Sequence, residues 1–232
     1  MKKYNVQNWE DYYSNHALSS HNVVALNNHY NVNLKELDVG IKQAIDTHGM
    51  FPYPKGINKG HPDTWGTTTW PGYYGLCFKS FPNAENPLQD GLSSNSVNHD
   101  WKTDFDTNFT EKTDAWFPYL DELVSKFRGT VTQLRLIKLE ARCNLGEKLH
   151  MDYPWYKGIR LHICLTPDID YTWTVLDKDY TVKRSNKIHF LDAGKPHNAK
   201  NENSDRDRYV LNINVLPKLD YDIDYQIENN LV

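Results

Sequence analysis

The spacing of hydrophobic residues changes near residue 130 of this 232-residue chain. Before that point, apolar residues recur at helical spacing in two stretches, 34–49 and 113–129, and each stretch ends at a glycine that can cap a helix. Pro118 lies in the first turn of the second helix, where proline is tolerated. The expected apolar stripes are Leu34, Leu37, Val39, Ile41 and Ile45 in the first helix, and Leu120, Leu123, Val124 and Phe127 in the second.

Short apolar runs, separated by turn residues, follow residue 130 and indicate β-strands. No helical pattern lies between the runs, which favours antiparallel over parallel sheets. We therefore predict a mainly β fold with flanking helices, built on a double-stranded β-helix core, the jelly-roll or cupin-like arrangement. The predicted strands cover 132–141, 149–153, 158–165, 171–177, 180–184, 187–192 and 208–216.

We expect one domain over residues 1–232. Its N-terminal part, 1–130, holds the helices and an aromatic, Gly/Pro-rich segment at 50–100, followed by a jelly-roll core at 131–218 and a C-terminal tail at 219–232. Within 50–100 we expect a strand near 73–80 and otherwise loop. A loop of this length covers a functional site or packs its aromatic residues against the sheet.

Composition narrows the function classes. Hydrophobic residues make up 39% of the chain and charged residues 24%, with a formal net charge of −4, so no basic surface for nucleic acid is expected. Three cysteines without a CxxC pair favour a reducing compartment over a disulfide framework, and we expect a cytoplasmic protein. The sequence shows no signal-peptide pattern and no apolar run of about 18 residues, so we expect no membrane partner.

Two neighbouring predicted strands each carry a pair of ionisable residues on one face. Alternate residues of a strand share a face, so His150 and Asp152 point the same way, as do Arg160 and His162. If this face lines the inside of the sandwich, the groups need partners, because unpaired buried charge is costly. A metal and an anionic ligand would supply them. The alternative for Arg160 and His162 is the outward polar face of an amphipathic strand.

His197 and Arg208 extend this set. His197 follows a Gly-Lys-Pro turn at the entry to a strand, and Arg208 opens the apolar strand 208–216. Two histidines and one carboxylate form the facial triad of non-haem Fe(II) sites, which leaves coordination positions for a cosubstrate and O2. An arginine offers a planar two-point grip on a carboxylate. The sequence therefore contains a candidate iron centre with a candidate cosubstrate anchor.

A histidine and an aspartate two residues apart are weak evidence by themselves. The chain has a second such pair, His61-Pro62-Asp63, whose proline cannot donate to a sheet ladder. It lies in the Gly/Pro-rich segment, and no Arg-x-His follows it at a comparable distance. We expect this second pair to lie in a loop.

Residues 115–217 resemble the aspartyl/asparaginyl β-hydroxylase-like branch of the Fe(II)/2-oxoglutarate-dependent dioxygenases. The helix WFPYLDELVSKF leads into RLIKLEARCNLGEKLHMD, which is similar to the approach to the proximal metal motif. Arg-Leu-His at 160–162 follows at the family's distance. The segment NKIHFLDAGKPHNAKN is similar to the distal histidine region, and RDRYVLNINVLP to the last core strand with its cosubstrate arginine.

The resemblance implies a role for each of these residues. Arg208 would bind the distal carboxylate of 2-oxoglutarate, with Arg206 as a less favoured substitute because it lies in the polar stretch NENSDRD. Arg160 and His162 would contact the same cosubstrate near its metal-bound end. The implied ligands of the catalytic Fe(II) are His150, Asp152 and His197.

The implied reaction is hydroxylation of an unactivated C–H bond with O2 and 2-oxoglutarate, which releases succinate and CO2. Asp152 favours the free-amino-acid hydroxylases of this branch, such as those acting on proline, because its animal peptidyl hydroxylases lack the carboxylate. We therefore expect a small polar substrate, a free amino acid or a derivative. Hydroxylation of a protein Asp, Asn or Pro side chain is the alternative among enzymes, and a non-catalytic jelly-roll binding module is the alternative outside them.

Candidate substrate contacts come from two regions. Trp65, Trp70 and Tyr73 in the aromatic segment form either a substrate wall or packing against the sheet. Arg135, on the strand before the metal motif, is a candidate contact for a substrate carboxylate.

Overall fold

A seven-stranded antiparallel sheet, in the order β1-β10-β7-β12-β6-β3-β2, is the largest element of the structure. The structure is a computed structural model that describes residues 21–26, 28–54, 69–90, 92, 109–127, 129–143, 149–152 and 158–216. The strands of this sheet are β1 (Val23–Ala25), β2 (Phe51–Pro54), β3 (Thr69–Cys77), β6 (Thr130–Leu139), β7 (Ile159–Cys164), β10 (His189–Leu191) and β12 (Arg208–Leu216).

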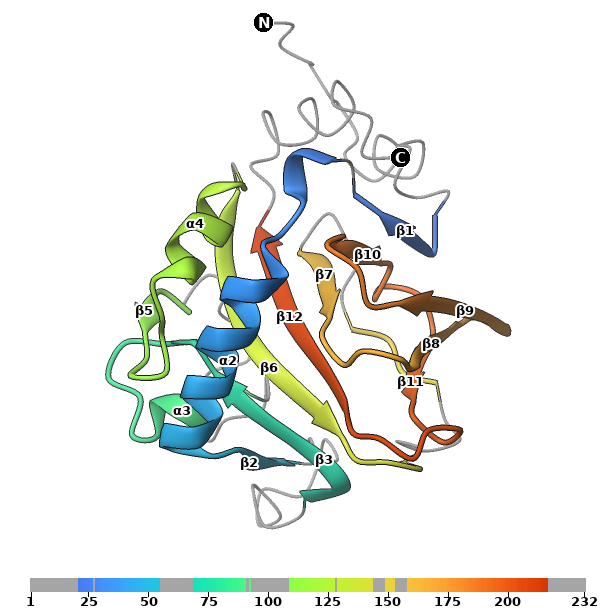
Figure 1. Cartoon of the computed structure of the whole chain (residues 1–232), viewed down its shortest axis with the longest axis horizontal. Coiled ribbons are helices and arrows are strands. Elements are labelled where there is room, and N and C mark those ends of the chain that lie inside the picture. Colours follow the sequence, from blue (N-terminus) through green and yellow to red (C-terminus); the bar gives the residue numbers. More distant parts are fainter. Residues whose placement is uncertain are drawn as a thin grey trace, which may run out of the picture.

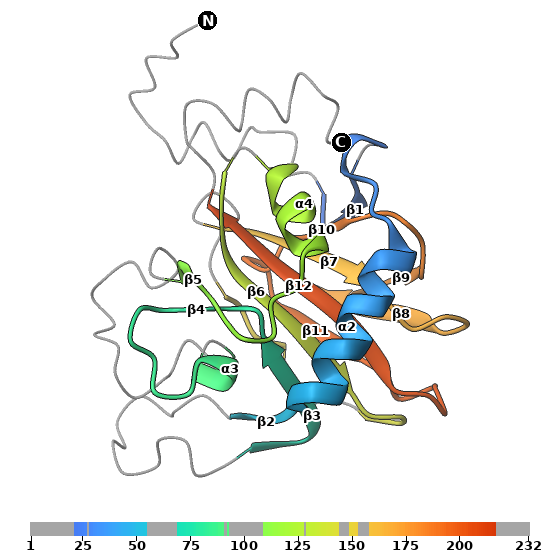
Figure 2. The same cartoon turned by 60° about the vertical axis from the view of Figure 1, so that its left-hand side comes forward.

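A three-stranded antiparallel sheet and the longer helices lie on opposite faces of the large sheet (Figures 1 and 2). The small sheet has the order β11-β8-β9, and a further pair, β4-β5, is separate. The strands of the three-stranded sheet are β8 (Asp170–Val175), β9 (Lys178–Lys183) and β11 (His197–Lys200). The separate two-stranded pair consists of β4 (Lys79–Ser80) and β5 (Glu111–Lys112). The helices are η2 (Asn28–Tyr30), α2 (Leu34–His48), α3 (Pro87–Asp90) and α4 (Tyr119–Ser125).

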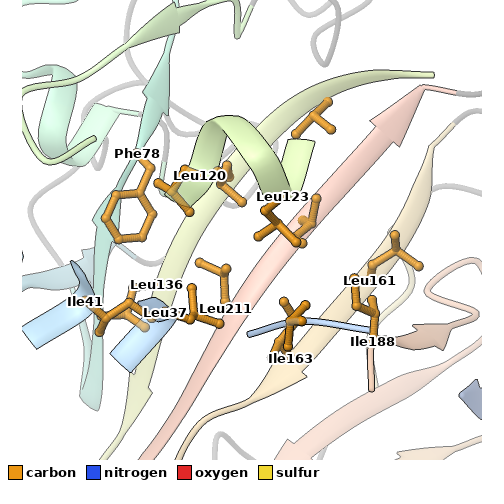
Figure 3. Close-up of a cluster of buried hydrophobic side chains, with 14 of the residues drawn as sticks. Leu37, Ile41, Phe78, Leu120, Leu123, Leu136, Leu161, Ile163, Ile188 and Leu211 are labelled. Atoms are coloured by element: carbon orange, nitrogen blue, oxygen red, sulfur yellow. The ribbon is translucent and has the colours of Figure 1, made fainter. Parts of the chain in front are cut away.

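The main hydrophobic core lies between the large sheet and the helices. Leu211 of β12 faces Leu37 of α2 and Leu123 of α4 (Figure 3). Ile213 of β12 belongs to the same cluster, and all four side chains are fully buried. Burying each such side chain contributes about 2 kcal/mol to folding, before the entropy cost of ordering it. This apolar face fixes the register of β12, so its alternate residues must point toward the small sheet.

The opposite face of the large sheet carries polar residues into the space between the two sheets. Arg208 of β12 lies 4.9 Å from the rings of both Tyr171 and Trp173 on β8. His162 of β7 stacks on Trp173 at 5.1 Å between ring centroids. The predicted mainly β architecture of two facing antiparallel sheets with flanking helices is confirmed, and its interior is polar on the side of the candidate site.

Several predicted elements are confirmed, and three details are wrong. The strand 208–216 and the helix at 34–49, with Gly49 as its C-cap, match the structure. Val39 does not belong to the buried stripe, because its side chain is 63% exposed. The run 149–152 forms no strand; it contributes one isolated bridge, between His150 and His197. Pro118 precedes α4, which is shorter than predicted.

The aromatic segment contributes more sheet than predicted. β2 and β3 both come from it, and β3 pairs with β6 from Tyr73 opposite Leu139 to Cys77 opposite Arg135. The strand expected near 73–80 therefore begins earlier, at Thr69. Residues 55–68, which include the pair His61-Pro62-Asp63, lie outside the described residues. No helix in the part of the chain that the structure describes could span a membrane.

Gly40 allows the close approach of α2 to Phe117. A Cβ at this position would lie 2.1 Å from the Phe117 ring, which is itself buried. We expect Gly40→Ala to lower the free energy of unfolding by about 1–2 kcal/mol, because the overpacking exceeds the gain in helix propensity. Urea unfolding measures this change. Val39→Ala, on the exposed side of the same helix, should change stability by less than about 0.5 kcal/mol. A Gly40→Ala protein as stable as the wild type would contradict this packing.

Candidate metal centre

His150, Asp152 and His197 converge on one point. One ligand atom from each side chain lies within 4.8 Å of the others. The backbone brings the two histidines together, because the His150 N–H donates to the His197 carbonyl at 3.0 Å and the His197 N–H donates to the His150 carbonyl at 2.8 Å. Their rings lie 4.4 Å apart between centroids. A candidate metal centre is therefore built from β11 and the run just before β7.

The His197 ring is oriented with Nε2 toward Asp152. Its Nδ1 lies 2.9 Å from the Lys195 carbonyl, which can only accept, so Nδ1 carries the proton and Nε2 keeps its lone pair. Burial, and the neighbouring His150, lower the pKa of His197 to about 4. A neutral imidazole with a fixed tautomer is the state that binds metals.

Asp152 is held by Arg160. Arg160 Nη1 lies 2.7 Å from Asp152 Oδ2, and Arg160 Nε donates to Asn214 Oδ1 at 2.7 Å. Asn214 in turn donates to Gln133 Oε1 at 2.6 Å. Burial opposes the charged form of Asp152, but Arg160 and the two histidines outweigh it and hold the pKa of this carboxyl below its usual range. Arg160 therefore fixes an ionised carboxylate at the centre.

His162 is a buried, neutral imidazole beside this centre. Burial and the charge of Arg160 lower the pKa of His162 well below its usual value. Asn212 Nδ2 lies 3.3 Å from His162 Nε2, which makes Nε2 the acceptor and places the proton on Nδ1. Nδ1 is buried and has no hydrogen-bond partner among the described residues. Among the described residues, this N–H is a donor without an acceptor.

Arg208 is fixed on three sides. Its Nη1 donates to the carbonyls of Lys200 and Thr172 at 2.6 and 2.9 Å, and its guanidinium lies 4.9 Å from the Tyr171 and Trp173 rings, which are neighbours on one face of β8. Only 1% of the residue is exposed. Its Nε is buried and lacks a partner in the described part of the chain. Arg206 instead is exposed and contacts Asp168 and the Pro167 carbonyl, so it does not reach this interior.

The donor set fits a non-haem iron with a dicarboxylic cosubstrate. Two imidazoles and one carboxylate are the ligands of facial-triad Fe(II) sites, and they leave open positions. Two buried N–H groups, on His162 and Arg208, have no acceptor among the residues that the structure describes, and they are suited to anionic oxygens. The cosubstrate contacts implied by the sequence therefore have the chemistry that 2-oxoglutarate needs.

The candidate substrate residues have different surroundings. Tyr73 and Arg135 lie on the interior face of β3 and β6, and their electrostatic interactions reach Asp152. Trp70 is 38% exposed. Trp65 lies outside the described residues.

Sequence reasoning missed three residues at this site. Asn212 and Asn214 alternate with the apolar residues of β12 and face the interior, where they support His162 and Arg160. The alternation in LNINV was the available signal. Trp173 contacts both His162 and Arg208. The sequence around Trp173 does not indicate these contacts, because they arise only where the small sheet packs against the large one.

The low pKa of His197 makes the metal-free protein less stable in acid. The unfolded chain takes up a proton near pH 6.5 and the folded chain only near pH 4, so stability is lost as the pH falls through this window. We expect His197 to account for a loss of about 2 kcal/mol between pH 7.5 and pH 5. Urea unfolding at both values checks this. In His197→Asn, the loss of unfolding free energy between pH 7.5 and pH 5 should be smaller by about 2 kcal/mol. The same loss in this variant and in the wild type would contradict the role of His197.

Comparisons with known proteins bear on the fold. A scan against models of protein families and a search of curated proteins find no match to the sequence. A solved oxidoreductase of the 2OG-Fe(II) oxygenase family from Burkholderia pseudomallei is similar in structure over 94% of each chain, with a TM-score of 0.50 and 9% identity. A predicted oxalate decarboxylase from Thermotoga maritima is similar over 38% of this chain and 68% of its own, with a TM-score of 0.30 and 20% identity. The chain has the jelly-roll fold that its strand pattern predicts.

Proposed function

We propose that this protein is an Fe(II)- and 2-oxoglutarate-dependent dioxygenase of the aspartyl/asparaginyl β-hydroxylase-like branch. We further propose that it hydroxylates a free amino acid or a derivative. The observation that carries the proposal is the convergence of His150, Asp152 and His197 beside the buried Arg208. The full-length likeness to a 2OG-Fe(II) oxygenase fold supports it.

The chain's residues would hold the reactants in fixed positions. Bound Fe(II) supplies activation of O2 coupled to oxidative decarboxylation of 2-oxoglutarate. Arg160 orients Asp152 through Oδ2, the carboxylate oxygen that also lies 3.9 Å from His197 Nε2. The Lys195 carbonyl keeps the His197 lone pair directed toward the same point. These contacts fix the ligand geometry before any reactant enters.

Arg208 and His162 would bind the cosubstrate. Arg208 Nε is the buried donor for the distal carboxylate, and the Lys200 and Thr172 carbonyls, together with the Tyr171 and Trp173 rings, hold the guanidinium in place. His162 Nδ1 donates to an oxygen nearer the metal. Because Trp173 contacts both residues, it couples their positions. The buried interior excludes water from these hydrogen bonds and strengthens them.

Succinate release tests the proposal. Purified protein is incubated with Fe(II), 2-oxoglutarate and O2, with and without a panel of free amino acids, and succinate is measured. We expect slow formation alone, faster formation with at least one amino acid, and none after removal of iron by a chelator. Stimulation by Asp, Asn or Pro peptides but not by free amino acids would favour the protein-hydroxylase alternative. No succinate and no binding of 2-oxoglutarate would leave only a binding module.

A further inference from the structure

The turn formed by residues 192–197, between β10 and β11, contacts all three candidate ligands through its backbone. The Ala193 carbonyl accepts the N–H of Asp152 at 2.9 Å. The Lys195 carbonyl lies 2.9 Å from His197 Nδ1. His197 itself, the last residue of the turn, exchanges two backbone hydrogen bonds with the other candidate histidine. The positions of the three side chains therefore depend on the conformation of this one segment.

Asp192 closes the turn. Its Oδ2 lies 3.0 Å from Lys195 Nζ, and its Oδ1 accepts the Gly194 N–H at 3.2 Å. The Asp192 side chain is only 6% exposed. A buried carboxylate is costly unless it is paired and hydrogen-bonded, and these two contacts offset that cost. The ion pair thus joins the first residue of the turn to the residue whose carbonyl orients His197.

Asn22, the residue before β1, holds the same turn from outside. Its main-chain carbonyl accepts the Asp192 N–H at 2.9 Å, and its Oδ1 accepts from Lys195 Nζ at 2.8 Å. Its Nδ2 donates to the Tyr180 hydroxyl of β9 at 2.6 Å. Both members of the ion pair are therefore anchored to one residue, which ties the turn to the N-terminal strand and to the small sheet.

We propose that Asp192 is a positioning residue of the metal centre: paired with Lys195, it holds the turn 192–197 in the conformation that directs His197 and Asp152 toward the metal. Asp192 acts through the backbone of the turn and is not one of the three residues whose ligand atoms converge. The inference rests on the ligand set of the proposed function. The alternative is an ion pair that stabilises the fold and leaves the ligands unaffected.

Metal affinity in two paired variants tests this role. Co(II) is titrated under argon into the metal-free protein, and its visible absorption reports the dissociation constant and the coordination geometry. Asp192→Asn removes the negative charge and Lys195→Met the positive charge, and both keep the backbone carbonyls. If the pair positions the turn, both substitutions weaken Co(II) binding, by roughly tenfold. If the pair acted only through its charges, Asp192→Asn would weaken binding and Lys195→Met would strengthen it.

The tautomer of His197 provides a second readout. Ring nitrogen chemical shifts of the metal-free protein, assigned by NMR with the help of His197→Asn, distinguish a proton on Nδ1 from one on Nε2. We expect the proton on Nδ1 in the wild type. In Asp192→Asn and Lys195→Met the Nε2–H form should also be populated, because the Lys195 carbonyl is no longer held in place.

Gly40→Ala is the control for a general loss of stability. It overpacks the core on the opposite face of the large sheet, against Phe117. It should therefore keep the wild-type Co(II) affinity and the wild-type tautomer.

Three results would overturn the inference: wild-type affinity and tautomer in both paired variants, opposite changes of affinity in the two, or an equal loss of affinity in Gly40→Ala. If Asp192→Asn does not fold, Lys195→Met decides alone, since weaker binding supports the inference and unchanged or stronger binding contradicts it. If the wild type binds Co(II) and the variants match it, only the role of Asp192 fails. If the wild type binds no Co(II), the ligand set and the proposed function fail as well.

Discussion

Asp152→Ala is expected to reduce iron affinity and succinate formation by more than about a hundredfold. Loss of a residue that only orients a ligand already costs roughly ten- to a hundredfold, and Asp152 is proposed as a ligand itself. The substitution also removes one partner of Arg160, whose guanidinium lies 2.7 Å away and is largely buried. The buried cation then repels the metal that it formerly helped to position. Iron content after gel filtration, together with the succinate assay, measures both effects.

Two further variants separate chemistry from folding. Asp152→Asn keeps the volume and a polar contact to Arg160 but removes the charge, so it should keep more stability and still lose iron. Asp170→Asn is the matched control, since Asp170 is exposed on β8 and forms a long ion pair with Lys183 at 3.8 Å. It should leave iron content and turnover unchanged. Wild-type iron content in Asp152→Ala would contradict the assignment of the ligand set.

Arg208→Gln is expected to raise the KM for 2-oxoglutarate by roughly ten- to a hundredfold. A hydrogen bond to a charged group contributes about 1.5–3 kcal/mol, and the distal carboxylate would lose that contact. The guanidinium also donates to two backbone carbonyls, of Lys200 and Thr172, so stability should fall as well. The KM for 2-oxoglutarate and the melting temperature are therefore measured together.

Arg206→Gln provides the comparison at almost the same sequence position. Arg206 lies at the surface, where it contacts Asp168, and its loss should leave both the KM for 2-oxoglutarate and the melting temperature near the wild-type values. A lowered melting temperature with an unchanged KM in Arg208→Gln would make Arg208 a structural residue only. A raised KM in Arg206→Gln would instead favour the alternative arginine.

The elements predicted correctly are those whose pattern is local. Helix 34–49 has a stripe, an N-cap at Asn33 and a glycine at its end, and these features act within a few residues. Strand 208–216 alternates apolar and polar residues from Leu211 to Val215 and is apolar on both sides of that stretch. Val39 was wrongly placed in the buried stripe of this helix. Helical spacing identifies an apolar face only approximately, and which residues at its margin are buried depends on the sheet against which the helix packs.

The elements that were missed depend on contacts distant in the sequence. β2 and β3 join the sheet because β6 offers an edge about sixty residues later, and their Gly- and Pro-rich sequence conceals this pairing. The run 149–152 resembles a strand but pairs at one bridge only. The order and spacing of the motifs were enough to predict that the two histidines and the carboxylate converge. The stacking of Trp173 on His162 could not be predicted in this way, because it depends on how the two sheets pack against each other.

The reciprocal hydrogen bonds between His150 and His197 have a consequence for how the metal is taken up. Because the two main chains bind each other directly, the imidazoles are held together without needing an ion to join them. Little conformational entropy then remains to be lost when a metal enters, which favours tight binding to a rigid apoprotein. An imidazole can also be replaced without breaking the bridge, since the side chain takes no part in it. Folding and metallation are thus expected to be separable steps in this protein.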